Sequence, residues 1–316
     1  MTQETLEQTF HVPSPACLNL GNIRGSVEVQ VGEDGLISVR AIKHVGSGSA
    51  KRTEIIMQQE EDGTVTVKTR NGNGSWGLFG LSQPCKVDYR VQVPRSCRLK
   101  ISGVSNTASI QGVEGEIEVS SVSGPLTLEN LTGPVFVHTV SGDISGTRLS
   151  GSLKLEAVSG SVQLSESSLL SAEGSTVSGN ISLETSLGEG PYRFSSVSAS
   201  VTLDVPDETR CTLKLNSLSG RCKSSLPVSS SQRHNGAQVL EVNGGGVLVS
   251  LSSTSGNLWL EAPMSELSKP VQPSQVVKPP EPPQPVAQPL STAEILERIE
   301  RGEMTVEEGL KALKGE

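Results

Sequence analysis

Aromatic residues are scarce in this 316-residue sequence, which holds two Trp, two Tyr and four Phe. A hydrophobic core must therefore be built on Val, Leu and Ile, which is typical of thin β structures. No apolar run approaches the 18 residues of a transmembrane helix. The N-terminus, MTQETLEQTF, has neither a basic nor an apolar signal region. We expect a cytoplasmic protein that is at most peripheral to the membrane.

Basic charge and metal-ligand patterns are also lacking. The net charge is −8, and residues 103–200 carry ten acidic against three basic side chains, which disfavours nucleic-acid binding. The five cysteines form no CxxC pair, and disulfides are not expected without an export signal. The four histidines are scattered and carboxylates do not cluster, so we predict no metal, no cofactor and no enzymatic activity.

What the sequence does contain is a nine-residue repeat. From Gly115 onward six units follow one another, namely GEIEVSSVS, GPLTLENLT, GPVFVHTVS, GDISGTRLS, GSLKLEAVS and GSVQLSESS. Alternate units end in Val-Ser-Gly or in Leu-Thr-Gly and Leu-Ser-Gly, so the full period is two units. A unit this short cannot bury its apolar face alone, and neighbouring units must stack. We predict a mainly β protein, a single-stranded β-solenoid with about 18 residues per coil.

The repeat assigns residues to columns that run along the solenoid. The residue before the serine of the first corner is always aliphatic, and its successive occupants are Val104, Val122, Val140, Val158, Val177, Val197 and Leu218. We expect this column to be buried, so that Val158→Asp is severely destabilising. A β-sandwich also contains many short strands, but its hairpins do not require a constant nine-residue register.

A second column is small, polar and uncharged. Three residues beyond each corner glycine stand Ser109, Thr127, Ser145, Gln163, Ser182 and Thr202. We expect these side chains on one outer face. The simpler interpretation is that Ser and Thr suit exposed solenoid strands, and the alternative is a binding surface for a sugar or another protein.

The chain divides into four parts. Residues 1–102 alternate without the nine-residue period and predict a β-rich N-terminal cap, followed by the solenoid at 103–262. Proline is so frequent at 263–290 that a flexible linker is expected. Residues 291–316 contain two capping boxes separated by a glycine, which predict a short helical hairpin, a two-helix module.

Two apolar groups are candidate partner contacts. The first lies in the loop at 71–84 and consists of Trp76, Leu78, Phe79 and Leu81. It either packs onto the cap, which is the simpler interpretation, or contacts a partner or a membrane. The second belongs to the predicted hairpin and consists of Ile295, Leu296, Ile299, Leu310 and Leu313. These are too few to hold a two-helix unit alone, so we expect the hairpin to self-associate or to bind a protein partner.

The repeats TVSGDIS (139–145), AVSGSVQL (157–164) and TVSGNISLE (176–184) resemble the bacterial putative-adhesin family of β-strand-repeat proteins of unknown function, over about residues 10–262. The segment ILERIERGEMTVEEGLKAL resembles the SHOCT-like helical hairpin of LiaX-like and YvlB-like proteins. The resemblance implies a β-solenoid and, in some members, cell-envelope stress signalling, with no catalytic residues. We therefore expect a non-enzymatic interaction scaffold. An adhesin or glycan-binding module and a self-assembling, bactofilin-like solenoid are the alternatives.

Overall fold

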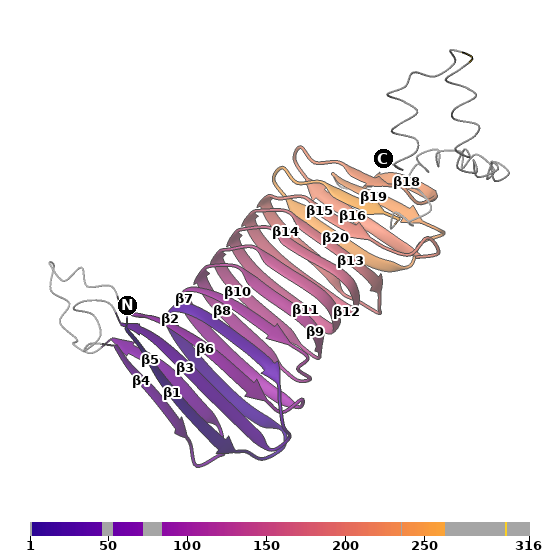
Figure 1. Ribbon diagram of the computed structural model, residues 1–316. Coiled ribbons are helices and arrows are strands. Elements are labelled where there is room, and N and C mark those ends of the chain that lie inside the picture. Colours follow the sequence, from indigo (N-terminus) through magenta and orange to yellow (C-terminus); the bar gives the residue numbers. More distant parts are fainter. Residues whose placement is uncertain (1, 46–52, 72–83, 235, 263–300, 302–316) are drawn as a thin grey trace, which may run out of the picture. The chain divides into compact units, whose positions relative to one another are not determined.

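The computed structural model describes residues 2–45, 53–71, 84–234, 236–262 and Arg301, and every regular element in these residues is a β-strand (Figure 1). In chain order the strands are β1 Thr2–His11, β2 Ala16–Val31, β3 Leu36–Val45, β4 Thr53–Gln59, β5 Val65–Asn71, β6 Lys86–Val93, β7 Cys97–Gln111, β8 Ile117–Ser123, β9 Leu126–Thr132, β10 Val135–Ser141, β11 Ile144–Ser159, β12 Val162–Ser178, β13 Ile181–Leu187, β14 Tyr192–Ser198, β15 Val201–Asp204, β16 Cys211–Ser217, β17 Cys222–Ser224, β18 Val228–His234, β19 Ala237–Val242, β20 Val247–Ser253 and β21 Leu258–Glu261.

The central strands pair in parallel with the strands one coil away. Val135 of β10 aligns with Ile117 of β8 on one side and with Leu153 of β11 on the other, each 18 residues distant. The strands of a β-sandwich pair antiparallel, so a parallel register offset by one coil identifies a solenoid. The β-solenoid with about 18 residues per coil is thereby confirmed.

The two-helix module is the part of the predicted fold class that is wrong. The described residues contain strands only and no helix. Capping boxes and helical periodicity are local signals, and short helices gain most of their stability from packing that this segment cannot supply alone. The expected linker at 263–290 and hairpin at 291–316 lie outside the described residues, apart from Arg301. For the described residues the fold class is corrected to an all-β solenoid with β caps.

Each coil contributes one strand segment to each of two faces. Face A contains β8, β10 and β14, and face B contains β9, β13 and β15, whereas β7, β11 and β12 run across a corner from one face to the other. In most coils the chain passes from face A to face B at a glycine, which allows close stacking, whereas Asn106 and Ala199 take this position in two coils. Gly142 has a φ of 146°, and a Cβ on it would clash with the carbonyl oxygen of Gly124 one coil away.

Aliphatic side chains from both faces fill the interior between them. In one coil, Val135, Val137, Ile144 and Leu149 are each at most 3% exposed, and the same inward positions are buried in neighbouring coils. Full burial of such side chains contributes about 1.5–3 kcal/mol each. The core is therefore continuous along the stack rather than centred at one point.

Antiparallel strands close both ends of the stack. At the N-terminal end β3 pairs with β6, β1 with β3, and β4 with β5, while at the C-terminal end β19 pairs with β16 and β18 with β19. Coils also continue N-terminal of residue 103, because β2 aligns in parallel with β7 over both faces.

The last coil in the sequence is not the last in the stack. Strand β20 lies between β14 and β16, and β21 lies between β15 and β17. The chain thus skips a layer after β15, turns back through the antiparallel pair β18 and β19, and fills the vacant layer with β20 and β21.

Candidate functional site

Six valines form an exposed column at the corner where the chain leaves face A. This valine column consists of Val104, Val122, Val140, Val158, Val177 and Val197, one in each of six successive coils. Their exposed fractions lie between 40% and 51%, and Leu218 in the last coil is 89% exposed. The prediction that this column is buried is wrong, and so is the severe effect expected of Val158→Asp.

Unbroken strand alternation turns these valines outward. Val137 and Thr139 on face A are each 3% exposed, so the next residue of the strand, Val140, points to the opposite side. The inward slot nearest the corner is thus occupied by a small residue such as Thr139. The aliphatic side chain that follows it remains at the surface.

At the opposite corner the side chains point in different directions, because one residue there has a left-handed backbone conformation. Arg148 has a φ of 55°, and the alternation shifts by one, which buries Leu149 at 2% exposure. Asn130 has a φ of 58° and precedes the buried Leu131 in the same way. The two corner types that alternate in the sequence therefore differ in side-chain direction as well as in residue type.

Serine hydroxyls fix the backbone of the valine column. The hydroxyl of a corner serine donates to the valine carbonyl of the preceding coil. The pairs are Ser123 to Val104 at 3.2 Å, Ser141 to Val122 at 3.3 Å and Ser159 to Val140 at 3.3 Å. These hydrogen bonds link the backbones of adjacent coils along the column.

Small polar residues flank the valine column. The adjacent outward row on face A consists of Ser102, Ser120, His138, Glu156, Ser175 and Ser195. On the corner side the row is Ser105, Ser123, Ser141, Ser159, Ser178 and Ser198. The single carboxylate in these rows, on Glu156, pairs with Lys154 Nζ at 3.2 Å and His138 Nδ1 at 3.4 Å. The hydrogen bond from Lys154 is the largest cause of the lowered pKa of Glu156.

The register places the predicted polar residues in one column on face B. Thr127, Ser145, Gln163, Ser182 and Thr202 align coil by coil and are exposed or half-exposed. Beyond Thr202 the column continues to Trp259 of β21, which is 39% exposed. Trp259 is not among the site residues predicted from the sequence.

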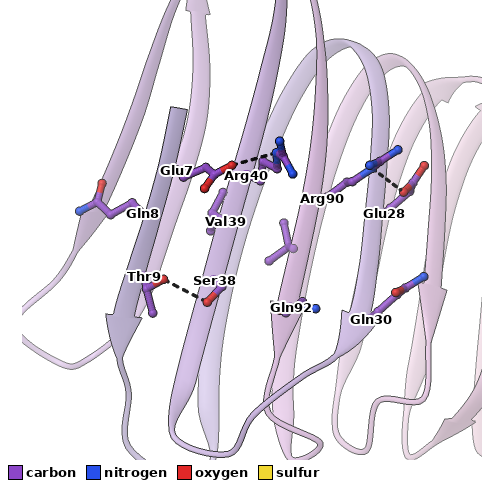
Figure 2. Close-up of a pocket in the computed structure, with 11 residues that line it drawn as sticks. Glu7, Gln8, Thr9, Glu28, Gln30, Ser38, Val39, Arg40, Arg90 and Gln92 are labelled. Atoms are coloured by element: carbon purple, nitrogen blue, oxygen red, sulfur yellow. Dashed lines mark hydrogen bonds and ion pairs between the residues drawn. The ribbon is translucent and has the colours of Figure 1, made fainter. Parts of the chain in front are cut away.

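A shallow polar groove of about 390 Å³ lies on the outer surface of β1, β3, β6 and β2 (Figure 2). Each of its arginines is paired, Arg40 with Glu7 at 2.9 Å and Arg90 with Glu28 at 3.3 Å. The groove therefore presents no unbalanced positive charge to an anionic ligand.

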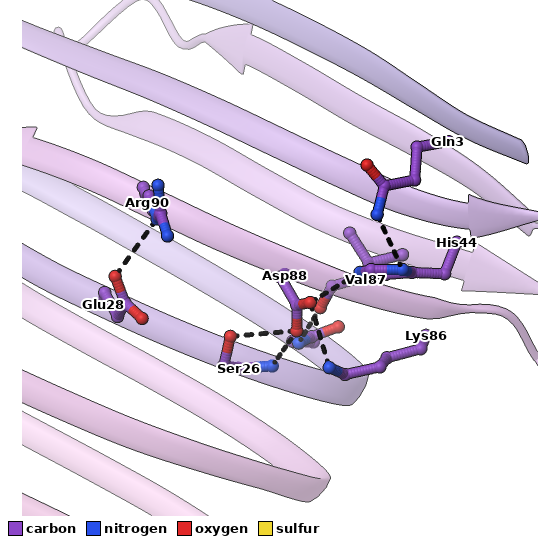
Figure 3. A network of polar contacts seen from close by, with 9 residues as sticks. Gln3, Ser26, Glu28, His44, Lys86, Val87, Asp88 and Arg90 are labelled. Carbon is purple, nitrogen blue, oxygen red and sulfur yellow. Dashed lines mark hydrogen bonds and ion pairs between the residues drawn. The ribbon is translucent and has the colours of Figure 1, made fainter.

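Asp88 of β6 links three strands through a polar network (Figure 3). Its Oδ2 contacts His44 Nε2 at 2.6 Å and Lys86 Nζ at 3.0 Å, and its Oδ1 accepts hydrogen bonds from the backbone nitrogen and hydroxyl of Ser26. Burial raises the pKa of Asp88, but the hydrogen bonds from Lys86, Ser26 and His44 together outweigh it and leave the pKa lowered. With every nearby charge paired, the arrangement is structural.

Three carboxylates align near the C-terminal end of face B. Asp204 stands beside Glu184 on one side and Glu261 on the other. Burial, followed by the like charges of Glu261 and Glu184, raises the pKa of Asp204. Among the described residues no group of His, Cys, Asp and Glu could hold a metal ion.

Cys97 and Cys222 are poor nucleophiles in this fold. Burial, with the nearby Cys17, raises the pKa of the Cys97 thiol to about 12, and burial, with the nearby Cys211, raises that of Cys222 to about 12. The thiolate, which is the reactive form, is therefore disfavoured. The described residues also include no helix long and apolar enough to cross a membrane.

Two groups of predicted contact residues cannot be placed. Trp76, Leu78, Phe79 and Leu81 lie outside the described residues, as do Ile295, Leu296, Ile299, Leu310 and Leu313. Of the predicted site residues, the structure brings together those of the polar column on face B.

The family model described as Toastrack DUF4097 matches residues 22–261. The chain belongs to the Toastrack family. The matched part of this Toastrack protein contains the whole valine column and the whole polar column. A search among curated proteins found no match.

Solved structures similar to this Toastrack protein include proteins from Bacteroides, Parabacteroides and Clostridium species. A "putative adhesin" from Bacteroides fragilis NCTC 9343 is 8% identical with a TM-score of 0.46, covering 81% of this chain and 97% of that one. Another, from Parabacteroides merdae ATCC 43184, is 9% identical with a TM-score of 0.40, covering 82% and 96%. A "putative cell adhesion protein" from Clostridium sporogenes ATCC 15579 is 11% identical with a TM-score of 0.26, covering 82% and 100%.

Proposed function

We propose that this Toastrack protein is a non-enzymatic interaction scaffold that binds a protein partner through its valine column. The observation that carries the proposal is an exposed β-branched aliphatic side chain at the same position in six coils. Thr and Val both favour strands, so strand propensity alone does not explain why valine recurs at this position. Covering apolar surface contributes about 25 cal/mol per Å², so a continuous apolar column favours association.

The proposed setting is bacterial cell-envelope stress signalling on the cytoplasmic side, in line with the resemblance of the repeats to LiaX-like and YvlB-like proteins. A bactofilin-like polymer would instead use the ends of the stack. There the outermost strands β1, β4 and β18 run antiparallel to their neighbours, which interrupts the parallel register that end-to-end stacking would continue, whereas β17 on face B is parallel to β21. The side of the solenoid is therefore the better supported surface.

Photo-crosslinking in the native cell tests the proposal. A photoreactive amino acid is placed at position 158 in the valine column and, as the matched control, at position 163 in the polar column, where Gln163 is also exposed. We expect a discrete crosslinked protein from position 158 and none from position 163. Equal crosslinking at both positions, or none at position 158, would refute the valine column as the binding surface.

A glycan-binding module is the second candidate, favoured by the exposed Trp259 that follows Thr202 in line with the polar column. A Trp ring beside hydroxyl and amide side chains combines an apolar stacking surface with hydrogen-bonding groups. In a Trp76→Phe variant Trp259 is the single tryptophan, so soluble cell-wall oligosaccharides should shift its fluorescence if they bind. An unchanged spectrum up to millimolar sugar would eliminate this candidate.

A further inference from the structure

We infer that the valine column binds the valine column of a second copy of this chain, forming a symmetric dimer. The inference rests on the proposed function and names its partner. Two properties of the column support it, its pitch and its lack of charge, and its area sets the affinity that we expect.

The pitch of the column matches another stack of β-coils. Successive valines stand in adjacent strands, which are about 4.8 Å apart. Side chains on one side of an extended strand repeat about every 6.8 Å, and one turn of an α-helix rises 5.4 Å. Across the five gaps of the column a helix would drift by about 3 Å and a strand by about 10 Å. A second valine column has the same spacing, so its valines stay opposite those of the first column along the whole length.

The surroundings of the column permit a close approach of two copies. The chain carries a net charge of −8, so most of its surfaces would repel each other. The flanking rows contain one carboxylate, on Glu156, and it is paired with Lys154. Their remaining side chains are mainly serine, whose small size lets two faces come within about 10 Å.

The same rows argue against a lipid surface as the occupant. Segments that lie in a membrane interface usually carry Trp or Tyr and several Lys or Arg beside the apolar side chains. The two flanking rows contain none of these four residue types.

The area of the column predicts a weak dimer. Six layers and their flanks cover a strip about 24 Å long and about 15 Å wide, on the order of 400 Å² per partner. A standard interface covers about 800 Å² per partner. In a two-fold symmetric dimer both copies use the same surface, so no surface remains for a third copy and association stops at the dimer. We expect a dimer that dissociates on dilution within the micromolar to millimolar range.

Sedimentation equilibrium of the full chain from about 10 µM to about 1 mM tests the inference, a range chosen for a small interface. The test variant is Val140→Ser with Val158→Ser. The matched control is Leu170→Ser with Leu248→Ser, which removes two aliphatic side chains that are 62% and 50% exposed and lie off the column. We expect a concentration-dependent dimer in the wild type and the control, and a dissociation constant at least tenfold higher in the test variant, since each dimer loses four contacting valines.

A wild-type chain that stays monomeric at every concentration would overturn the inference, as would a test variant that dimerises like the wild type. The photo-crosslinking result separates this failure from failure of the proposed function. A monomer that still crosslinks a different protein from position 158 leaves the interaction surface standing and removes the second copy as its partner. A monomer that crosslinks nothing from that position would refute both the interaction surface and the second copy as its partner.

Discussion

Arg148 shows how one backbone conformation decides which side chain reaches the core. Its φ of 55° shifts the inward and outward alternation of β11 by one residue and turns Leu149 into the interior. A non-glycine residue in this left-handed region costs about 1–2 kcal/mol. The cost is tolerated because Leu149 is buried in return.

Replacing Arg148 with glycine should therefore stabilise the protein by about 1 kcal/mol, because the left-handed strain is relieved. The lost ion pair with Glu166 joins side chains that are 53% and 62% exposed, and such pairs contribute little. Urea denaturation measures the change. The control is Lys154→Gly on face A, where the backbone is ordinary strand and glycine should destabilise by about 0.5–1 kcal/mol. Destabilisation of both variants alike would contradict the assignment.

The direction of individual side chains was only partly predictable from the sequence. The repeat identified which residues share a column, but the same Gly-to-Ser template was read at both corners. The missed signal was the alternation of side chains along the strand. Because Val137 points inward, Thr139 two residues later also points inward, and Val140 points outward. A left-handed φ at Arg148, by contrast, has no strong sequence signature, because arginine is not a residue that favours it.

At the scale of strands, two aspartates respond oppositely to pH. The pKa of Asp88 is lowered in the folded state, so its ionised form stabilises the contacts between β6, β3 and β2 above the unfolded pKa of 3.8. This contribution is lost as the pH falls through the lower folded pKa. Asp88→Asn should destabilise the protein at pH 7 by about 1–3 kcal/mol through the weakened hydrogen bonds to Ser26 and Lys86.

The difference between the wild type and Asp88→Asn should shrink as the pH falls below about 4, because the wild-type carboxyl is then protonated too. Urea denaturation curves at a series of pH values measure it. A difference that stays constant down to pH 2 would mean that the charge of Asp88 plays no part.

The carboxyl of Asp204 should have the opposite effect on how stability depends on pH. Its folded pKa is raised, so folding favours its protonated form, and this contribution is lost as the pH rises through the folded pKa. Asp204→Asn should therefore be more stable than the wild type at pH 7, and the advantage should disappear below about pH 4. Thermal melts at pH 7 and at pH 3.5 make the comparison. A variant less stable than the wild type at pH 7 would contradict the repulsion from Glu261 and Glu184.

At this scale the sequence predicted the coil and the polar column well, because a constant period determines register directly. It did not predict that β20 and β21 fill a layer between β14–β15 and β16–β17. The order of the layers in the stack depends on which strands pair, and the spacing of the repeats along the sequence does not specify pairing. The expected two-helix module failed for a related reason, since local helix signals do not supply a packed core.

At the scale of the whole described part of the chain, the molecule up to residue 262 is a stack with two unlike side surfaces. The corner beyond face A carries the apolar valine column, and face B carries the uncharged polar column, which Trp259 and then Lys223 continue. Because the core is continuous and each coil repeats the same contacts, stability is distributed along the stack. The residues at outward positions are not constrained by core packing. They can therefore form an interaction surface without a special loop or pocket.

The exposure of the valine column is the central claim, and one pair of substitutions tests it most directly. Val158 is 45% exposed and Leu155, three residues earlier in β11, is 2% exposed. Urea denaturation at low protein concentration should show that Val158→Asp changes the free energy of unfolding by about 0.5 kcal/mol or less, whereas Leu155→Asp costs several kcal/mol. Equal and large losses for both variants would place Val158 in the core and remove the surface on which both proposals depend.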